Sequence, residues 1–264
     1  MRNKFSEIIT KEAEKNSKIV LLSGDIGNRL FDNYKKKCHD RFYNCGVAEG
    51  MMTSLAAGLA STGLKVFTYT IATFNTLRCL EQIKLDFAYQ NIDATIVGTG
   101  SGLSYSSLGA THHSLDDFSI LKCIPNIKIL SPGDKNELEN SLKIIFNNKG
   151  PFYLRIGKKN EKTVFKSIPT AKLGKVNIIK KGKNNLIICV GTTISLGQEI
   201  YNKSKNKKDI ELVSVHSIKP FDEKYFEKQF KQKKKIILLE EQTKQFWLRK
   251  FIKKSSLYKK DIPQ

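Results

Sequence analysis

The chain has 264 residues, of which 46 are Lys or Arg and 25 are Asp or Glu, so its formal net charge is +21. This length allows one large domain or two modest ones with apolar cores. No run of 18 apolar residues occurs, and residues 1–18 resemble an amphipathic helix rather than a signal peptide. We therefore expect a cytoplasmic protein that has no membrane partner.

The basic residues show no pattern that points to a nucleic acid. Only six of the 46 are Arg. Aromatic residues do not alternate with them, as they do in modules that stack on RNA or single-stranded DNA. We predict no nucleic-acid partner, although part of the charge could serve a phosphorylated substrate or an acidic protein.

The first part of the chain alternates short apolar strands with longer helical patterns. Strands are predicted at 18–24, 65–70, 94–98, 127–130 and 152–156. Helices are predicted at 49–62, 73–89 and 134–148, the last with Asp134 as its N-cap. This alternation is typical of a mostly parallel sheet covered by helices on both faces.

The composition becomes lysine-rich at 157–185, and a second alternation of strands and helices follows this segment. We expect strands at 186–191, 210–216 and 235–241, and helices at 194–204, 222–232 and 242–254. The predicted fold class is α/β, with two doubly wound, mostly parallel-sheet domains. Domain boundaries are expected at 1–157 and 185–264, joined by a linker at 158–184 that contains a short hairpin or edge strand.

Several short patterns resemble metal or nucleotide sites without completing one. The five cysteines form no CxxC pair, and Cys123 and Cys189 stand in apolar runs that predict buried thiols. The adjacent histidines of "THH" (111–113) cannot easily reach one ion. "GTGSG" (98–102) lacks the third glycine of the dinucleotide fingerprint. We assign no metal ligand to this chain.

One acid stands out in the segment "NCGVAEGMMTS" (44–54), which continues into "LAAGLASTG". Glu49 is the only charged residue among small and apolar neighbours, at the predicted start of a helix. Ala56, Ala57, Gly58 and Ala60 would let that helix approach another backbone closely. Physical reasoning alone leaves open whether Glu49 has a functional or a purely structural role, because an acid in the first helical turn is also favoured by the helix dipole.

Three blocks of sequence resemble the pyrimidine-binding domain of transketolase-like thiamine diphosphate enzymes. They are "GVAEGMMTSLAAGLASTG" (46–63), "TIATFNTLRCLEQIKLDFAYQN" (70–91) and "GTGSGLSYSSLGATHHSLDDFSILKCIPNIKILSPGD" (98–134). They occur in the order found in that family. The chain resembles the C-terminal-half subunit of a split transketolase, with the pyrimidine-binding domain followed by a shortened C-terminal domain.

The resemblance gives Glu49 a catalytic role at the cofactor. Glu49 matches the acid that bonds N1′ of the aminopyrimidine of thiamine diphosphate. Burial in a dry, apolar cleft favours the neutral form of a carboxyl group, which can then share its proton with a ring nitrogen. Phe74 matches the aromatic residue that stacks on the pyrimidine, and Leu77 falls near a second such position. Asp25 falls near an acid at the subunit contact and is included among the cofactor-binding candidates.

The resemblance also suggests residues that face the substrate. His112 matches a histidine directed at the cofactor and the substrate hydroxyl groups, where an imidazole can move protons. Arg2 and Lys158 fall near basic positions that hold a substrate phosphate, and Arg155 and Arg78 are further candidates.

The stretch from Ser114 to Asp117 resembles a capping box at the start of a helix, with Asp in place of the usual Glu or Gln. We therefore expect Ser114 and Asp117 to have a structural role rather than a catalytic one.

The chain lacks the Gly-Asp-Gly motif that holds the metal and the diphosphate in this family. The resemblance therefore implies a partner subunit, an N-terminal half that supplies the Mg²⁺ ligands, and self-association into an α2β2-like assembly. The expected activity is transfer of a two-carbon ketol unit between sugars or sugar phosphates. The alternatives are the β subunit of a 2-oxo acid or acetoin dehydrogenase E1 component, and a non-catalytic partner subunit.

Overall fold

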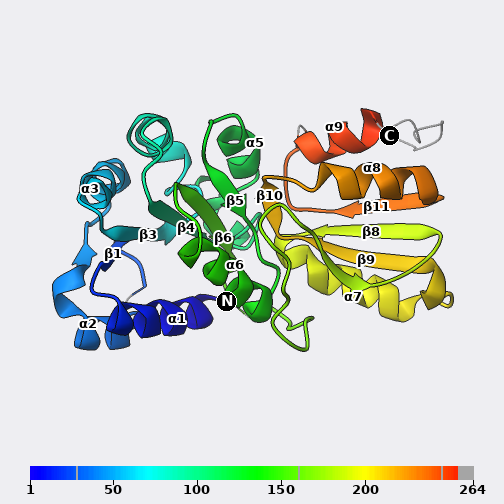
Figure 1. The fold of residues 1–264 in the computed structure, drawn as a ribbon, viewed down its shortest axis with the longest axis horizontal. Helices are drawn as coiled ribbons and strands as arrows, with labels where there is room; N and C mark the ends of the chain where they lie inside the picture. Colours follow the sequence, from blue (N-terminus) through cyan, green and yellow to red (C-terminus); the bar gives the residue numbers. More distant parts are fainter. Residues whose placement is uncertain (28, 160, 245, 255–264) are drawn as a thin grey trace.

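The computed structural model describes residues 1–27, 29–159, 161–244 and 246–254. They form two α/β units, the first at the left of Figure 1 and the second at the right. The α/β class and the two mostly parallel sheets predicted from the sequence are confirmed.

The first unit is built on a seven-stranded sheet in the order β10-β5-β6-β4-β3-β1-β2. Strands β1 to β6 run parallel, and only β10 is antiparallel to its neighbour. The central strands are buried along almost their whole length, as expected for a parallel sheet that is covered on both faces. The strands are β1 (Ile19–Ser23), β2 (Phe42–Asn44), β3 (Lys65–Ile71), β4 (Ala94–Thr99), β5 (Lys128–Leu130), β6 (Phe152–Ile156) and β10 (Ser217–Lys219).

Helices cover both faces of this sheet (Figure 1). One face packs against α1 (Arg2–Lys15), α2 (Asp32–Lys37) and α6 (Lys135–Phe146). The other face packs against α3 (Glu49–Ser61), the segment formed by α4 (Leu80–Gln82) and η3 (Ile83–Tyr89), and α5 (Asp117–Lys122). In α3, Ala56, Ala57 and Ala60 are buried as expected, whereas Gly58 is exposed and does not mediate a close approach.

The second unit has a four-stranded sheet in the order β11-β8-β9-β7, with β7 as an antiparallel edge strand. Helix α7 packs on one face, and α8 and α9 pack on the other. Its elements are β7 (Asn177–Lys180), β8 (Asn185–Val190), α7 (Ile194–Lys203), β9 (Ile210–Val215), α8 (Glu223–Gln232), β11 (Lys235–Leu239) and α9 (Trp247–Lys254). No described helix is long and apolar enough to cross a bilayer.

Strand β10 connects the two units. It follows β9 in the chain but pairs with β5 of the first sheet, so it lies between the two sheets in Figure 1. One buried apolar cluster also contains residues of both units, including Ile129 of β5, Val213 of β9 and Phe226 of α8. The second unit is therefore packed firmly against the first.

Two further local predictions are wrong. The helix expected at 73–89 begins later, as a 3₁₀ turn η2 (Leu77–Cys79) followed by α4 and the π-helical η3. Asn75 is fully buried and donates to the carbonyl of Val97 at 3.0 Å, and such side-chain bonds compete with helical ones. Cys123 is exposed rather than buried, whereas Cys189 is buried as expected.

Candidate active site at the carboxyl ends of the first sheet

The predicted site residues follow the carboxyl ends of parallel strands. Asp25 comes after β1, Glu49 after β2, Phe74 after β3, His112 after β4 and Lys158 after β6. The chain passes from β1 to β2 on one side and returns through α3 to β3 on the other side. In open α/β sheets, ligands bind where the strand order reverses in this way, outside the carboxyl ends of the strands.

Glu49 is the first residue of α3 and is 4% exposed. Its two carboxylate oxygens accept hydrogen bonds from a single nitrogen, Nη1 of Arg78, at 3.2 and 3.0 Å. The sequence-based expectation of an acid isolated among apolar residues is therefore wrong. Glu49 is instead held by a cation whose own side chain is 46% exposed.

Phe74 joins this ion pair to His112. The guanidinium carbon of Arg78 lies 3.8 Å from the centre of the Phe74 ring. The centroids of the Phe74 and His112 rings are 4.9 Å apart, with 66° between the ring planes. Glu49, Arg78, Phe74 and His112 thus form a continuous row, which we call the site row. The sequence suggested Arg78 only as a phosphate contact, because its pairing with Glu49 spans 29 positions.

Tyr105 extends the site row toward Lys158. Its ring centroid is 6.2 Å from that of His112, and the ammonium group of Lys158 lies 4.2 Å from the same Tyr105 ring. Lys158 also donates to the carbonyl of Ser104 at 3.4 Å. Sequence reasoning missed Tyr105, although it is the single aromatic residue between the end of β4 and the "THH" segment.

Arg2, Asp25 and Leu77 lie at the border of this group. Nε of Arg2 donates to the Tyr69 hydroxyl at 2.9 Å, and Arg2 forms no described hydrogen bond with the site row. The Asp25 carboxylate accepts from Nδ2 of Asn44 at 3.0 Å, which steadies the turn that leads to Glu49. Leu77 is 38% exposed and directly precedes Arg78.

The second unit supports the loop that carries His112. The hydroxyl oxygens of Ser101 and Thr192 are 3.1 Å apart, and Thr192 donates to Oε2 of Glu241 at 2.9 Å. At the other end of the loop, the amide of Thr243 donates to the carbonyl of Leu115 at 2.9 Å. The loop between β4 and α5 is therefore attached to the second unit at both ends.

The capping box expected from Ser114 to Asp117 is not formed. Helix α5 begins at Asp117, and Asp116 is its N-cap without a side-chain bond. The buried Asp117 carboxylate instead accepts from the Tyr153 hydroxyl at 2.7 Å and from Nη1 of Arg155 at 3.1 Å. Because Arg155 is 1% exposed, it is a buried structural partner of Asp117 rather than a phosphate contact.

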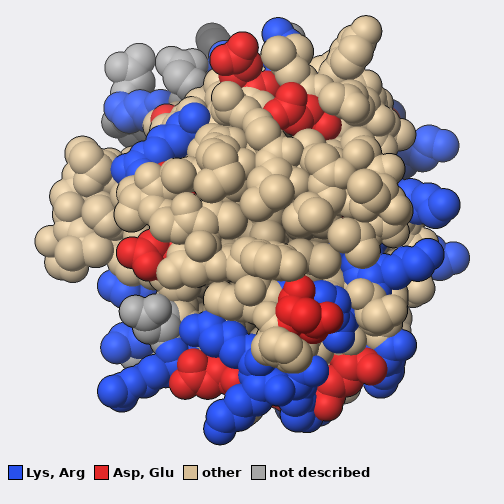
Figure 2. All heavy atoms as spheres, turned by 90° about the vertical axis from the view of Figure 1, so that its left-hand side faces the viewer, with Lys and Arg blue, Asp and Glu red and all other residues tan. Residues whose placement is uncertain are grey.

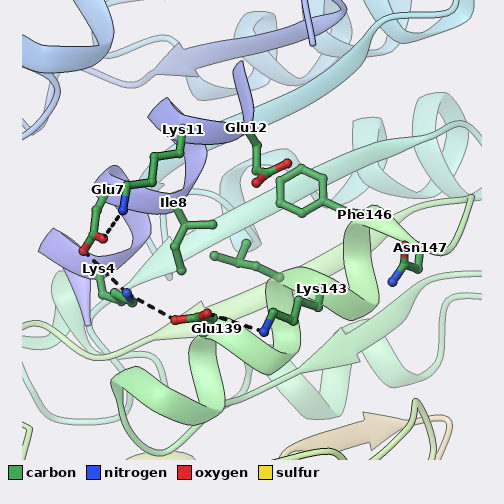
Figure 3. A pocket seen from close by; sticks show the side chains of 10 residues that line it. Lys4, Glu7, Ile8, Lys11, Glu12, Glu139, Lys143, Phe146 and Asn147 are labelled. Carbon is green, nitrogen blue, oxygen red and sulfur yellow. Dashed lines mark hydrogen bonds and ion pairs between the residues drawn. The ribbon is translucent and has the colours of Figure 1, made fainter. Parts of the chain in front are cut away.

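A groove between α1 and α6, with a volume of about 310 Å³, contains none of the predicted site residues. Its charged side chains neutralise one another, as Figure 3 shows: Lys4 pairs with Glu139 at 3.2 Å and Lys11 pairs with Glu7 at 2.8 Å. The groove therefore offers little unbalanced charge for a ligand, and we do not assign it a catalytic role.

The surface beside Glu49 is apolar and exposed. Figure 2 views the molecule from the left of Figure 1, where α2 and α3 lie, and a broad area of that face carries few charged side chains. The hydroxyl of Ser54 on α3 donates to Asp86 on η3 at 2.8 Å, so these two elements are neighbours. The exposed apolar residues on and around them are Val47, Met51, Leu55, Leu77, Leu85 and Tyr89.

Within the described part of the chain, no group of three or more His, Cys, Asp or Glu side chains could hold a metal ion. Besides the guanidinium group of Arg78, the site row offers a buried carboxylate, an aromatic face and an imidazole. Together they suit a flat nitrogen heterocycle that is hydrogen-bonded at one edge and stacked on one face.

Comparison with known proteins identifies the family that the whole chain resembles. Residues 1–163 match the family described as "Transketolase, pyrimidine binding domain", and residues 174–252 match "Transketolase, C-terminal domain". The chain is 30% identical over 246 residues to one of the subunits of the apulose-4-phosphate transketolase of Phocaeicola vulgatus, covering 92% of this chain and 79% of that protein. It is 31% identical to "Putative transketolase C-terminal section" of Methanocaldococcus jannaschii, covering 86% and 73%.

Among solved structures, the chain resembles "Split gene transketolase, inactive beta4 tetramer" with a TM-score of 0.82 and 24% identity. The similarity covers 91% of this chain and 79% of that one, and it shows a shared fold. Two family matches in sequence order, together with the identity to a transketolase subunit, establish the relationship. The chain belongs to the transketolase family.

Proposed function

We propose that this chain is one subunit of a thiamine diphosphate-dependent transketolase that transfers a two-carbon ketol unit between sugars or sugar phosphates. The observation that carries the proposal is the site row, because it places the carboxylate of Glu49, the ring of Phe74 and the imidazole of His112 at one edge of the sheet. When bound, thiamine diphosphate would supply the nucleophilic carbon that attacks a ketose carbonyl.

The residues of this chain would bind and orient the cofactor ring and move protons. Glu49 would hold a proton at the ring nitrogen N1′, in a position that is largely shielded from water. Phe74 would stack on the flat ring. His112 would exchange protons with substrate hydroxyl groups, since an imidazole ring can both donate and accept a proton.

Lys158 is the basic residue best placed for a substrate phosphate. Its ammonium group lies over the Tyr105 ring, which is next to His112 of the site row. Lys158 would act as a single positive charge rather than as a bidentate hydrogen-bond donor. Arg2, which is held by Tyr69, is the second candidate for this role.

We propose that a second polypeptide completes the site by supplying the Mg²⁺ ligands and the diphosphate contacts. Three observations support this proposal. Metal-binding clusters are lacking among the described residues, an apolar surface is exposed beside Glu49, and the similar solved structure is described as an inactive tetramer of a split-gene transketolase. Two copies of each polypeptide would give an α2β2-like assembly.

The proposal is tested by co-purifying the chain with its partner and supplying thiamine diphosphate and Mg²⁺. Ketose sugars and ketose phosphates are then compared with 2-oxo acids as donors. The proposal predicts turnover of the ketoses by the complex and none by this chain alone. Turnover restricted to 2-oxo acids would indicate a dehydrogenase component instead, and full activity without a partner would refute the two-subunit arrangement.

A further inference from the structure

Arg78 makes two contacts that coincide with those proposed for the cofactor ring. Its Nη1 atom donates to both oxygens of Glu49, and its flat guanidinium group lies over the face of Phe74. A bound aminopyrimidine would need a Glu49 oxygen as its hydrogen-bond partner and the Phe74 ring as its stacking surface. Arginine can imitate such a ring because its guanidinium group is planar, carries several N–H donors and stacks on aromatic faces.

Arg78 is held less rigidly than the acid it pairs with. Its side chain is 46% exposed, whereas that of Glu49 is only 3% exposed. Arg78 follows Leu77 in the short 3₁₀ turn η2 rather than lying inside a long helix. Its described polar contacts all go to Glu49. The side chain can therefore rotate into solvent without breaking other described polar contacts.

We propose that Arg78 is an internal competitor of the cofactor ring. In the unliganded chain it satisfies the buried Glu49 carboxylate and covers Phe74, and it must release at least one of these contacts before the ring can bind. This inference rests on the function proposed above. In this role Arg78 lowers the affinity for the cofactor. In the absence of the cofactor, it keeps the buried Glu49 carboxylate from being left without a partner.

Cofactor affinity provides a test that does not depend on turnover. Binding of thiamine diphosphate is measured by calorimetry on the complex with the partner subunit, in the presence of Mg²⁺. Arg78→Met keeps a long side chain but removes the charge and all donors. It is expected to bind the cofactor about two- to fivefold more tightly, the factor that corresponds to losing one partly exposed ion pair.

Two further variants sharpen the test. Arg78→Lys keeps the charge but loses the flat stacking surface, so its affinity should lie between those of the wild type and Arg78→Met. Lys143→Met removes a comparably exposed cation that pairs with Glu139 on α6, on the opposite face of the sheet, and should leave the affinity unchanged.

The outcomes separate this inference from the proposed function. If Glu49→Gln weakens binding but Arg78→Met binds equally or less tightly, the competitor role is wrong and the cofactor site stands. A raised KM for a sugar phosphate in that variant would identify Arg78 as a phosphate contact instead. If Glu49→Gln turns over ketoses like the wild type, the proposed function itself fails.

Discussion

Two buried acids of the first unit, Glu49 and Glu137, are held in different ways. Glu49 lies at the carboxyl edge of the sheet, and a half-exposed cation occupies both of its oxygens. Glu137, on α6, is fully buried at the junction of the two units, and its donors among the described residues are all neutral. These are the amide of Gly133 at 2.7 Å, Nδ2 of Asn177 at 2.8 Å and the hydroxyl of Ser214 at 2.9 Å.

The difference shows that burial of an acid does not by itself mark an active site. Burial raises the pKa of Glu137 to about 7, and its three donors only partly oppose this shift. Because two of those donors belong to the second sheet, Glu137 joins the units and has no access to a ligand. Glu49 can exchange its partner because the half-exposed Arg78 side chain can move into solvent. For a buried acid, a partner side chain that a ligand can replace is therefore a better indicator of function than burial.

The largest expected effect is that of Glu49→Gln on turnover. The amide cannot supply or accept the proton at the ring nitrogen, so the turnover of the complex should fall by at least about a hundredfold. The fold should persist, because one amide oxygen can still accept from Arg78. Steady-state kinetics and thermal unfolding of the same preparation measure both effects.

The matched control for this change is Glu81→Gln, an exposed acid on α4 outside the site row. It should leave both turnover and melting temperature unchanged. Turnover near the wild-type level in Glu49→Gln would remove Glu49 from the chemistry. A large drop in its melting temperature would show that the ion pair is mainly structural.

The second prediction concerns stability and pH at Glu137. Since the folded-state pKa is about 7 and the ordinary value is 4.5, the folded chain keeps a proton that the unfolded chain loses in this window. The stability contribution is fully present below about pH 4.5 and is lost as the pH rises through 7. The free energy of unfolding should therefore fall by roughly 3 kcal/mol across this range through Glu137 alone.

Glu137→Gln, which resembles the protonated acid, should remove this part of the pH dependence. Urea unfolding at pH 5 and pH 8 gives the change in the free energy of unfolding between the two pH values. This change is then compared between the wild type and Glu137→Gln. Glu139→Gln, two residues along the same helix and partly exposed, serves as the control. Parallel pH profiles for the wild type and Glu137→Gln would contradict the assignment.

The third prediction, with a smaller effect than the first two, concerns Phe74→Leu, which keeps an apolar side chain but removes the aromatic face. Loss of ring stacking is worth about 0.5–1.5 kcal/mol, so the affinity for thiamine diphosphate should fall by roughly two- to tenfold. Equilibrium binding to the complex measures it. Unchanged affinity would mean that the ring does not rest on Phe74.

The sequence predicts the strands well and the short elements poorly. Runs such as "IVLL" and "LIICV" are long and apolar enough to identify buried parallel strands. The three residues of β10 carry no such signal, because their pairing with β5 depends on how the second unit docks. The capping box failed for a similar reason, since Asp117 is engaged by Arg155 and Tyr153 from a distant strand.

The candidate site was predicted only in part. Glu49, Phe74 and His112 were suggested by resemblance to a family, and the fold brings them together at one edge. Spacing alone left Glu49 ambiguous, because a helix start favours an acid whether or not it is catalytic. The pairing of Glu49 with Arg78 and the role of Tyr105 could not be predicted, because both depend on contacts between loops that follow different strands.

The most direct test of the central claim is a crystal structure of the two-subunit complex with thiamine diphosphate. We predict a distance of about 2.7–3.2 Å between the ring nitrogen N1′ and a carboxylate oxygen of Glu49, with the ring face on Phe74. An aminopyrimidine bound elsewhere, beyond hydrogen-bonding reach of Glu49, would contradict it.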